Sequence, residues 1–159
     1  MTKISSEFVR AYGLLEQDYA DCRHDISCIS MEGPEKEIAL NQLISKYEPI
    51  RRDGMQRLGE ITTHFTELER ETHQQWVQQT DHWRNIHEAP FCWRIINKPE
   101  GYPGDYRLME MIYEQRQEGE TDWGKFIHKQ AVDSVACQAV RNRKDFLREQ
   151  IFSMNCGGG

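Results

Sequence analysis

Apolar residues recur every three or four positions along most of the chain, which is the spacing that one face of an α-helix requires. Near the N-terminus, Ser5 and Ser6 can cap a helix, whose apolar face would consist of Phe8, Tyr12, Leu15 and Tyr19. A second helix is expected after Gly33, because Pro34 suits a first helical turn. Its apolar residues are Ile38, Leu40, Leu43, Ile44 and Tyr47, and Pro49 is expected to interrupt or kink it.

The rest of the chain continues this helical pattern. A stripe that alternates by three and four, as in a coiled coil, predicts one seam in a bundle core: Leu58, Ile61, Phe65, Leu68 and Thr72. Further apolar helix faces are expected at residues 108–113 and, after a cap at Thr121, at Trp123, Phe126 and Ile127. The sequence therefore predicts an all-α, multi-helix bundle over residues 1–150, with at most a vestigial strand at the C-terminus.

A rigid loop, Lys98–Asp105, leads directly into the helix expected at residues 108–113. Its two prolines fix φ, and its two glycines permit backbone angles that other residues avoid. Asp105 can accept hydrogen bonds from the amides of the first helical turn. Such a loop would present Tyr102, Asp105 and Tyr106 from a fixed platform, which suits binding, although a plain structural connector has the same composition.

Charge and cysteine content narrow the class of protein. The net charge of −6 argues against a nucleic-acid partner, because no global basic field is available to attract phosphates. No stretch approaches the roughly 20 apolar residues of a membrane span, and no basic-then-apolar leader begins the chain. The 5 cysteines are widely spaced and include no CxxC pair. We therefore expect a cytoplasmic protein with reduced thiols.

Histidine and tryptophan are concentrated between residues 73 and 97. His73 and His87 could share a helix face but are too far apart in sequence to share one metal ion. Neither this pair nor His82 with His87 has the i, i+4 spacing of helical zinc ligands. No metal site is therefore expected, and the tryptophans are expected to pack the bundle.

A basic segment, Val140–Leu147, stands out on this otherwise acidic chain. Arg141 and Arg143 could clamp a carboxylate or a phosphate, because guanidinium donors form a fork that matches such oxygens. Pairing with nearby Glu and Asp side chains is an equally open alternative.

Three runs now carry a resemblance to a known family: GYPGDYRLMEMIY, then Trp123-Gly124-Lys125 with Ile127-His128, then Ala139-Val140-Arg141-Asn142-Arg143. Over about residues 90–148 the chain resembles the helical N-terminal region of the bacterial class I S-adenosylmethionine-dependent methyltransferases of 3-hydroxypalmitic acid methyl ester biosynthesis. In that family a Rossmann-like catalytic domain follows. The resemblance implies methyl transfer from S-adenosylmethionine to a fatty-acid-type carboxylate. It also implies that the residues that bind substrate or cofactor include Tyr102, Asp105, Tyr106, Arg141 and Arg143.

The last residues, Ile151–Gly159, resemble the first strand and glycine loop of such a catalytic domain. Cys156, Gly157 and Gly159 would belong to that loop, although Asn155 stands where a glycine is common. The sequence continues into no second strand and no acid for the cofactor ribose. Residues 151–159 are therefore interpreted as a truncated start of a Rossmann-like domain. On this interpretation the chain alone binds no S-adenosylmethionine and is inactive, and a catalytic domain or a partner chain completes the pocket.

Two other functions stay open. The chain could be a non-catalytic helical module for protein interaction or regulation, and apolar surface left exposed on it would favour homo-oligomers. Alternatively, the three terminal glycines could form the tail of a carrier protein, although such carriers usually have a compact, β-rich fold.

Overall fold

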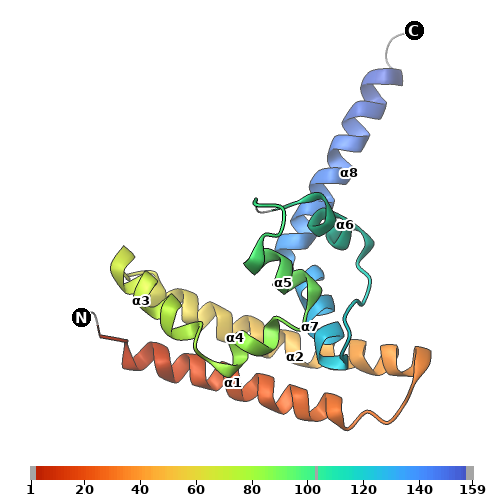
Figure 1. Ribbon diagram of the computed structural model, residues 1–159. Helices are drawn as coiled ribbons and strands as arrows, with labels where there is room; N and C mark the ends of the chain where they lie inside the picture. Colours follow the sequence, from red (N-terminus) through yellow and green to blue (C-terminus); the bar gives the residue numbers. More distant parts are fainter. Residues whose placement is uncertain (1–2, 103, 157–159) are drawn as a thin grey trace.

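Eight α-helices form the regular structure of the computed structural model, which describes residues 3–102 and 104–156 (Figure 1). They are α1 (Ser6–Ser27), α2 (Gly33–Thr62), α3 (Glu67–Val77), α4 (Asp81–Ile86), α5 (Pro90–Asn97), α6 (Tyr106–Glu114), α7 (Asp122–Val132) and α8 (Val135–Cys156). The described residues contain no β-strand, which confirms the predicted all-α fold.

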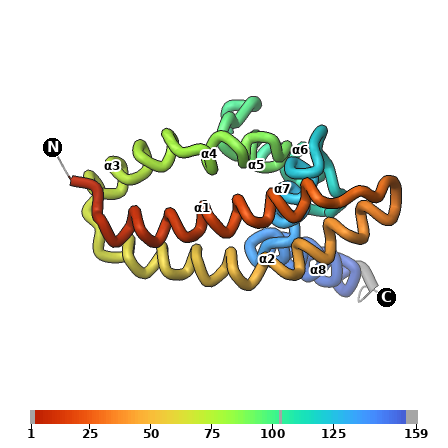
Figure 2. The backbone as a smooth tube through the Cα atoms, turned by 90° about the horizontal axis from the view of Figure 1, so that it is seen from below, coloured from red at the N-terminus to blue at the C-terminus, as the bar shows by residue number. Residues whose placement is uncertain are grey.

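Helices α1 and α2 run antiparallel along the length of the molecule (Figures 1 and 2). The hydroxyl of Ser5 caps α1 by accepting a hydrogen bond from the backbone N–H of Phe8 at 3.3 Å. The predicted apolar face is confirmed, since Phe8, Tyr12 and Leu15 are buried. Leu15 lies directly against Gly54 of α2, where a Cβ would be 2.9 Å from Leu15 Cδ1. Glycine at this position therefore lets the two helices pack closely.

Pro49 lies inside α2 without interrupting it. The helix extends from Gly33 to Thr62, so the expected interruption does not occur, and the alternative of a kink at Pro49 stays a prediction. Tyr47 and Leu58, which are buried on either side of Pro49, pack against the rest of the bundle. Tertiary packing of this kind supplies most of a helix's stability and outweighs the hydrogen bond that proline removes.

The seam predicted from Leu58 to Thr72 is divided between two helices. α2 ends before it is complete, and Thr66 caps the start of α3 by a capping box with Glu69. Thr66 N–H donates to Glu69 Oε2 at 2.8 Å, and Thr66 Oγ1 accepts from Glu69 N–H at 3.3 Å. The chain changes direction there, so Leu68 is exposed instead of packing in the core. A strong local cap has outweighed the apolar periodicity.

Helix α7 connects two of the three clusters of buried apolar residues that form the described core. Trp123, Phe126 and Ile127 pack in one cluster with residues of α1 and α2, and Val132 packs in another with residues of α5, α6 and α8. At Gly124 a Cβ would lie 2.6 Å from the carbonyl oxygen of Glu88, so only glycine allows this approach. The predicted cap at Thr121 is confirmed, because its hydroxyl accepts a hydrogen bond from Gly124 N–H at 2.9 Å.

Helix α8 begins in the core and then leaves the body of the molecule (Figure 1). Cys137 and Arg141 are buried, whereas every residue from 142 to 154 is exposed. Because α8 continues to Cys156, residues 151–156 are helical and do not form the first strand that their sequence resembles. Gly157 and Gly159 of the expected glycine loop lie outside the described residues, and the domain boundary near residue 151 stays a prediction.

Candidate functional site

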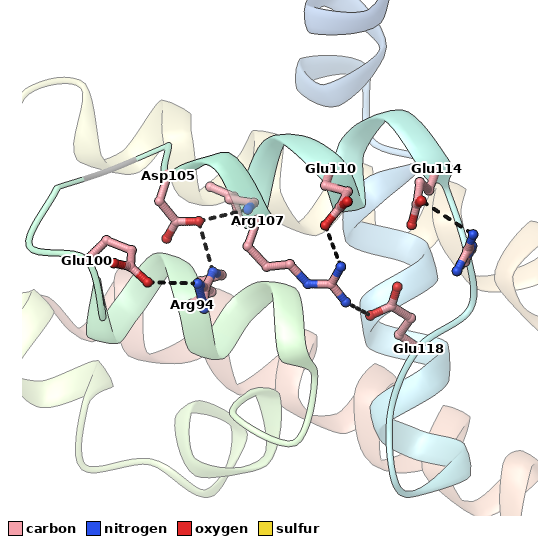
Figure 3. Close-up of polar contacts among 9 residues, drawn as sticks. Arg94, Glu100, Asp105, Arg107, Glu110, Glu114 and Glu118 are labelled. Atoms are coloured by element: carbon pink, nitrogen blue, oxygen red, sulfur yellow. Dashed lines mark hydrogen bonds and ion pairs between the residues drawn. The ribbon is translucent and has the colours of Figure 1, made fainter.

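The loop before α6 is built around the buried carboxylate of Asp105, which is 2% exposed. Its Oδ1 accepts hydrogen bonds from Leu108 N–H and from Arg94 Nε, both at 2.9 Å (Figure 3). Burial alone would raise the pKa of Asp105, but the hydrogen bonds from Leu108 and Arg94 and the Arg94 charge outweigh it and hold the pKa below its usual value. Asp105 therefore caps α6 and fastens the loop to α5.

The two tyrosines of this loop lie on the surface instead. Tyr106 is 75% exposed, and Tyr102 is also exposed. Gly101 and Gly104 adopt φ angles of 79° and 80°, in the region that favours glycine, and so allow the chain to turn on either side of Pro103, which lies outside the described residues. The expected three-residue platform is thus divided, with the carboxylate inside and both rings outside. Their roles in binding stay predictions.

A chain of ion pairs then fastens the connection between α6 and α7 to α6 (Figure 3). Arg107 lies 2.5 Å from Glu110 and 3.5 Å from Glu118, and Arg116 lies 3.3 Å from Glu114. These side chains are partly exposed, so each pair stabilises the fold only slightly. Their effect is to connect Arg116 and Glu118 to α6.

Arg141 is buried, and its two Nη atoms donate hydrogen bonds within the protein, whereas its Nε has no partner among the described residues. Its Nη1 donates to the carbonyl oxygens of Ile112 at 3.0 Å and Val132 at 2.7 Å, and its Nη2 donates to Gln138 Oε1 at 2.9 Å. Ile112 and Val132 lie at the C-terminal ends of α6 and α7, where carbonyl groups lack helical partners and cations are favoured. In this structure the guanidinium therefore joins three helices, and its predicted role in binding an anion stays a prediction.

Arg143 lies two residues further along α8 and faces solvent. It lines a hollow of about 690 Å³ between α6 and α8, together with Met109, Tyr113, Val140, Lys144, Leu147, Arg148, Ile151 and Phe152. We call these nine residues the α6–α8 groove. Lys144 Nζ lies 4.4 Å from the ring centroid of Tyr113, a cation–π contact across the groove. The groove combines an apolar floor with three cations, and none of its described lining residues is acidic.

The groove joins the first and the last of the three runs that carry the family resemblance. Met109 and Tyr113 come from the first motif, and Val140 and Arg143 come from the last. Tyr106 precedes Tyr113 by two helical turns and therefore lies on the same side of α6. The groove could not be predicted while residues 151–152 were expected to form a strand. A helical spacing was nevertheless present in the sequence, since residues 140, 144, 147, 151 and 154 follow one another by four, three, four and three positions and so share one face of a helix.

His128 and His82 pack inside the fold, and the described residues include no group of three or more His, Cys, Asp or Glu side chains that could hold a metal ion. His128 is fully buried in α7, and its Nδ1 accepts a hydrogen bond from Phe91 N–H at 3.3 Å. Burial, with the nearby charges of Lys129 and Arg107, lowers its pKa to about 4. His82 packs against Tyr19 at a centroid distance of 4.4 Å, and burial lowers its pKa to about 4 as well. Both rings are therefore neutral at pH 7.

The described residues do not by themselves fit a bound S-adenosylmethionine. The Asp105 carboxylate and the Arg141 guanidinium are engaged inside the fold, and residues 151–156 are helical where a strand and loop would be needed. Tyr102, Tyr106 and Arg143 are exposed, and of these three only Arg143 lines the groove. No chemical step on the cofactor can be assigned to these residues.

Comparisons of the chain with protein-family models, with curated proteins and with solved structures found no match. The family resemblance therefore rests on the sequence motifs alone.

Proposed function

We propose that this chain is a non-catalytic helical region that docks an S-adenosylmethionine-dependent methyltransferase domain on the α6–α8 groove. In this proposal it covers part of that domain's substrate or cofactor site, and the methyl acceptor is a fatty-acid-type carboxylate, as the resemblance implies. The observation that carries the proposal is the meeting of the first and last of these runs in one exposed groove.

The division of roles within each motif supports docking over catalysis. Asp105 and Arg141 stabilise the fold from inside, whereas Tyr106, Tyr113 and Arg143 are available at the surface. A surface that offers apolar and cationic side chains but no described acid is suited to contact and positioning. The cofactor and the reacting atoms would then belong to the docked domain.

Calorimetric titration of the chain with S-adenosylmethionine and S-adenosylhomocysteine tests this proposal. We expect no binding by the chain alone, and a one-to-one complex when a catalytic domain of the resembled family is added. Leu147→Asp should abolish that complex, whereas Leu14→Asp should preserve it. Leu14 is a matched control, because it is 53% exposed on α1 and Leu147 is 49% exposed in the groove. Cofactor binding by the chain alone, or a complex that survives Leu147→Asp, would contradict the proposal.

A second candidate, a helical interaction or regulatory module, rests on the same groove without any methyltransferase. It is favoured if the catalytic domain fails to bind while the groove still binds another helix.

A further inference from the structure

The exposed part of α8 has the spacing of a helix that pairs with another helix. Val140, Lys144, Leu147, Ile151 and Met154 follow one another by four, three, four and three residues, which is the a/d spacing of a coiled coil. Leu147, Ile151 and Met154 are exposed, and α8 projects from the body at these positions (Figure 1). Met109 and Tyr113 of α6 extend the surface beside this seam. The space is therefore shaped for the side chains of one more helix.

On this part of α8 the basic side chains lie on the groove side and the acidic side chains lie on the opposite side. Arg143, Lys144 and Arg148 line the groove. Asp145 and Glu149 lie about half a helical turn from Leu147, on the opposite side of α8. The chain as a whole carries a net charge of −6, so the groove is a local basic surface on an acidic molecule.

A second copy of the chain is a poor occupant for this groove. Pairing two α8 seams would bring Arg143 and Arg148, which flank the seam, against the same cations of the other copy. Like charges at such flanking positions select against self-pairing. A lipid surface is also a poor fit, because the hollow between α6 and α8 accepts protruding side chains and the exposed apolar residues Phe146 and Phe152 lie on different sides of α8.

We propose that the α6–α8 groove binds an amphipathic helix of a partner protein whose apolar seam is flanked by Asp or Glu. This deepens the proposed function, since it names the element through which the docked domain would attach. It does not require that domain to be a methyltransferase, so the two proposals can fail separately.

Two synthetic helical peptides test the proposal directly. Both carry the same Leu/Ile seam, and one has Glu and the other Lys at the flanking e and g positions. The full chain should bind the Glu peptide at least about tenfold more tightly at low salt, because each of the two exposed ion pairs, with Arg143 and with Arg148, contributes up to about a factor of five. Added salt should reduce this preference. Equal binding, or tighter binding of the Lys peptide, would overturn the proposal.

A charge-reversal variant separates a loss of charge complementarity from a loss of folding, because an unfolded variant would bind neither peptide. Arg143→Glu combined with Arg148→Glu should transfer the preference to the Lys peptide. Phe152→Ala should weaken Glu-peptide binding and Phe146→Ala should not, since the two rings are 59% and 58% exposed but only Phe152 lines the groove.

The other occupants give different results. If analytical ultracentrifugation shows that the chain is a dimer and that Leu147→Asp makes it a monomer, the proposal is overturned in favour of a second copy. Binding to phosphatidylserine vesicles that is lost in the same variant, with no preference between the peptides, would overturn it in favour of a lipid surface. None of the described helices has an apolar stretch long enough to cross a bilayer.

Discussion

The first part of α8 buries the charged side chain of Arg141, whereas the part beyond residue 142 exposes Phe146, Leu147, Ile151 and Phe152 to solvent. Burial of a charged side chain costs free energy because the charge loses its hydration, and exposure of an apolar side chain costs free energy because of the hydrophobic effect. The cost of burying Arg141 is offset by three hydrogen bonds to helix ends and a side chain. Arg148 Cζ lies 5.7 Å from the ring centroid of Phe152, a cation–π contact, but all four apolar residues stay exposed. The first part of α8 is thus explained by folding, and the second part is where we propose that a partner binds.

The largest effect is expected at the buried arginine. Arg141→Met should lower the free energy of unfolding by about 2–4 kcal/mol, because it leaves two carbonyl groups without their donors. Arg143→Met, two residues away and exposed, should change it by less than about 0.5 kcal/mol. Urea unfolding of the two variants makes the measurement. Equal effects would remove the distinction between the two parts of α8.

Acid should weaken the body of the molecule through His128. Its pKa in the folded state is about 4, below the unfolded value, so the unfolded chain binds more protons between pH 4 and 6.5. Stability should therefore fall as the pH drops through this range, and His82 acts in the same direction. Between pH 7 and pH 5 His128 should account for about 2 kcal/mol. We expect His128→Gln to flatten the pH dependence of urea unfolding by that amount, and an unchanged slope would show that His128 is not neutral when buried.

A smaller effect is expected at the cap of α6. Asp105→Ala should lower the unfolding midpoint by about 3 °C or more, since the helix loses its cap and Arg94 loses the nearer of its two carboxylate partners. The carboxylate has a lowered pKa, so its contribution is present above the unfolded pKa and is lost as the pH falls through the folded value. The measurement is differential scanning calorimetry of Asp105→Ala at pH 7, with Asp145→Ala as the control because Asp145 is exposed on α8. If Asp145→Ala were as damaging, the loop would not depend on this cap.

The smallest effect on stability should come from the groove. Leu147→Asp and Ile151→Asp should each change the free energy of unfolding by less than about 0.5 kcal/mol, because both side chains are already in water. The same variants should abolish binding of the Glu-flanked peptide. A large loss of stability on urea unfolding would mean that the exposed part of α8 packs against the body in solution.

Most of the fold could be predicted from apolar spacing and caps. The face of α1 and the cap at Thr121 depend on residues close in sequence, and such local signals survive in the folded chain. The break between α2 and α3 was missed because the capping box at Thr66 competed with a continuing apolar stripe.

The site was predicted only in part, for a different reason. Residue type indicated that Arg141 and Arg143 prefer oxygen partners, but only the packing of α6 and α7 decides that Arg141 finds them inside the protein. The groove required knowing that α8 continues past residue 150 and that α6 lies beside it. Neither fact is local in sequence.

The bonds of Arg141 also determine a direction in space. The Arg141 guanidinium joins the first turns of α8 to the C-terminal ends of α6 and α7. These hydrogen bonds constrain the angle at which α8 leaves the body of the molecule. A helix or domain seated along the distal turns would therefore be presented at a defined orientation to the exposed tyrosines of the loop before α6. Loss of the Arg141 hydrogen bonds would therefore change the orientation of α8 without removing any side chain from the α6–α8 groove.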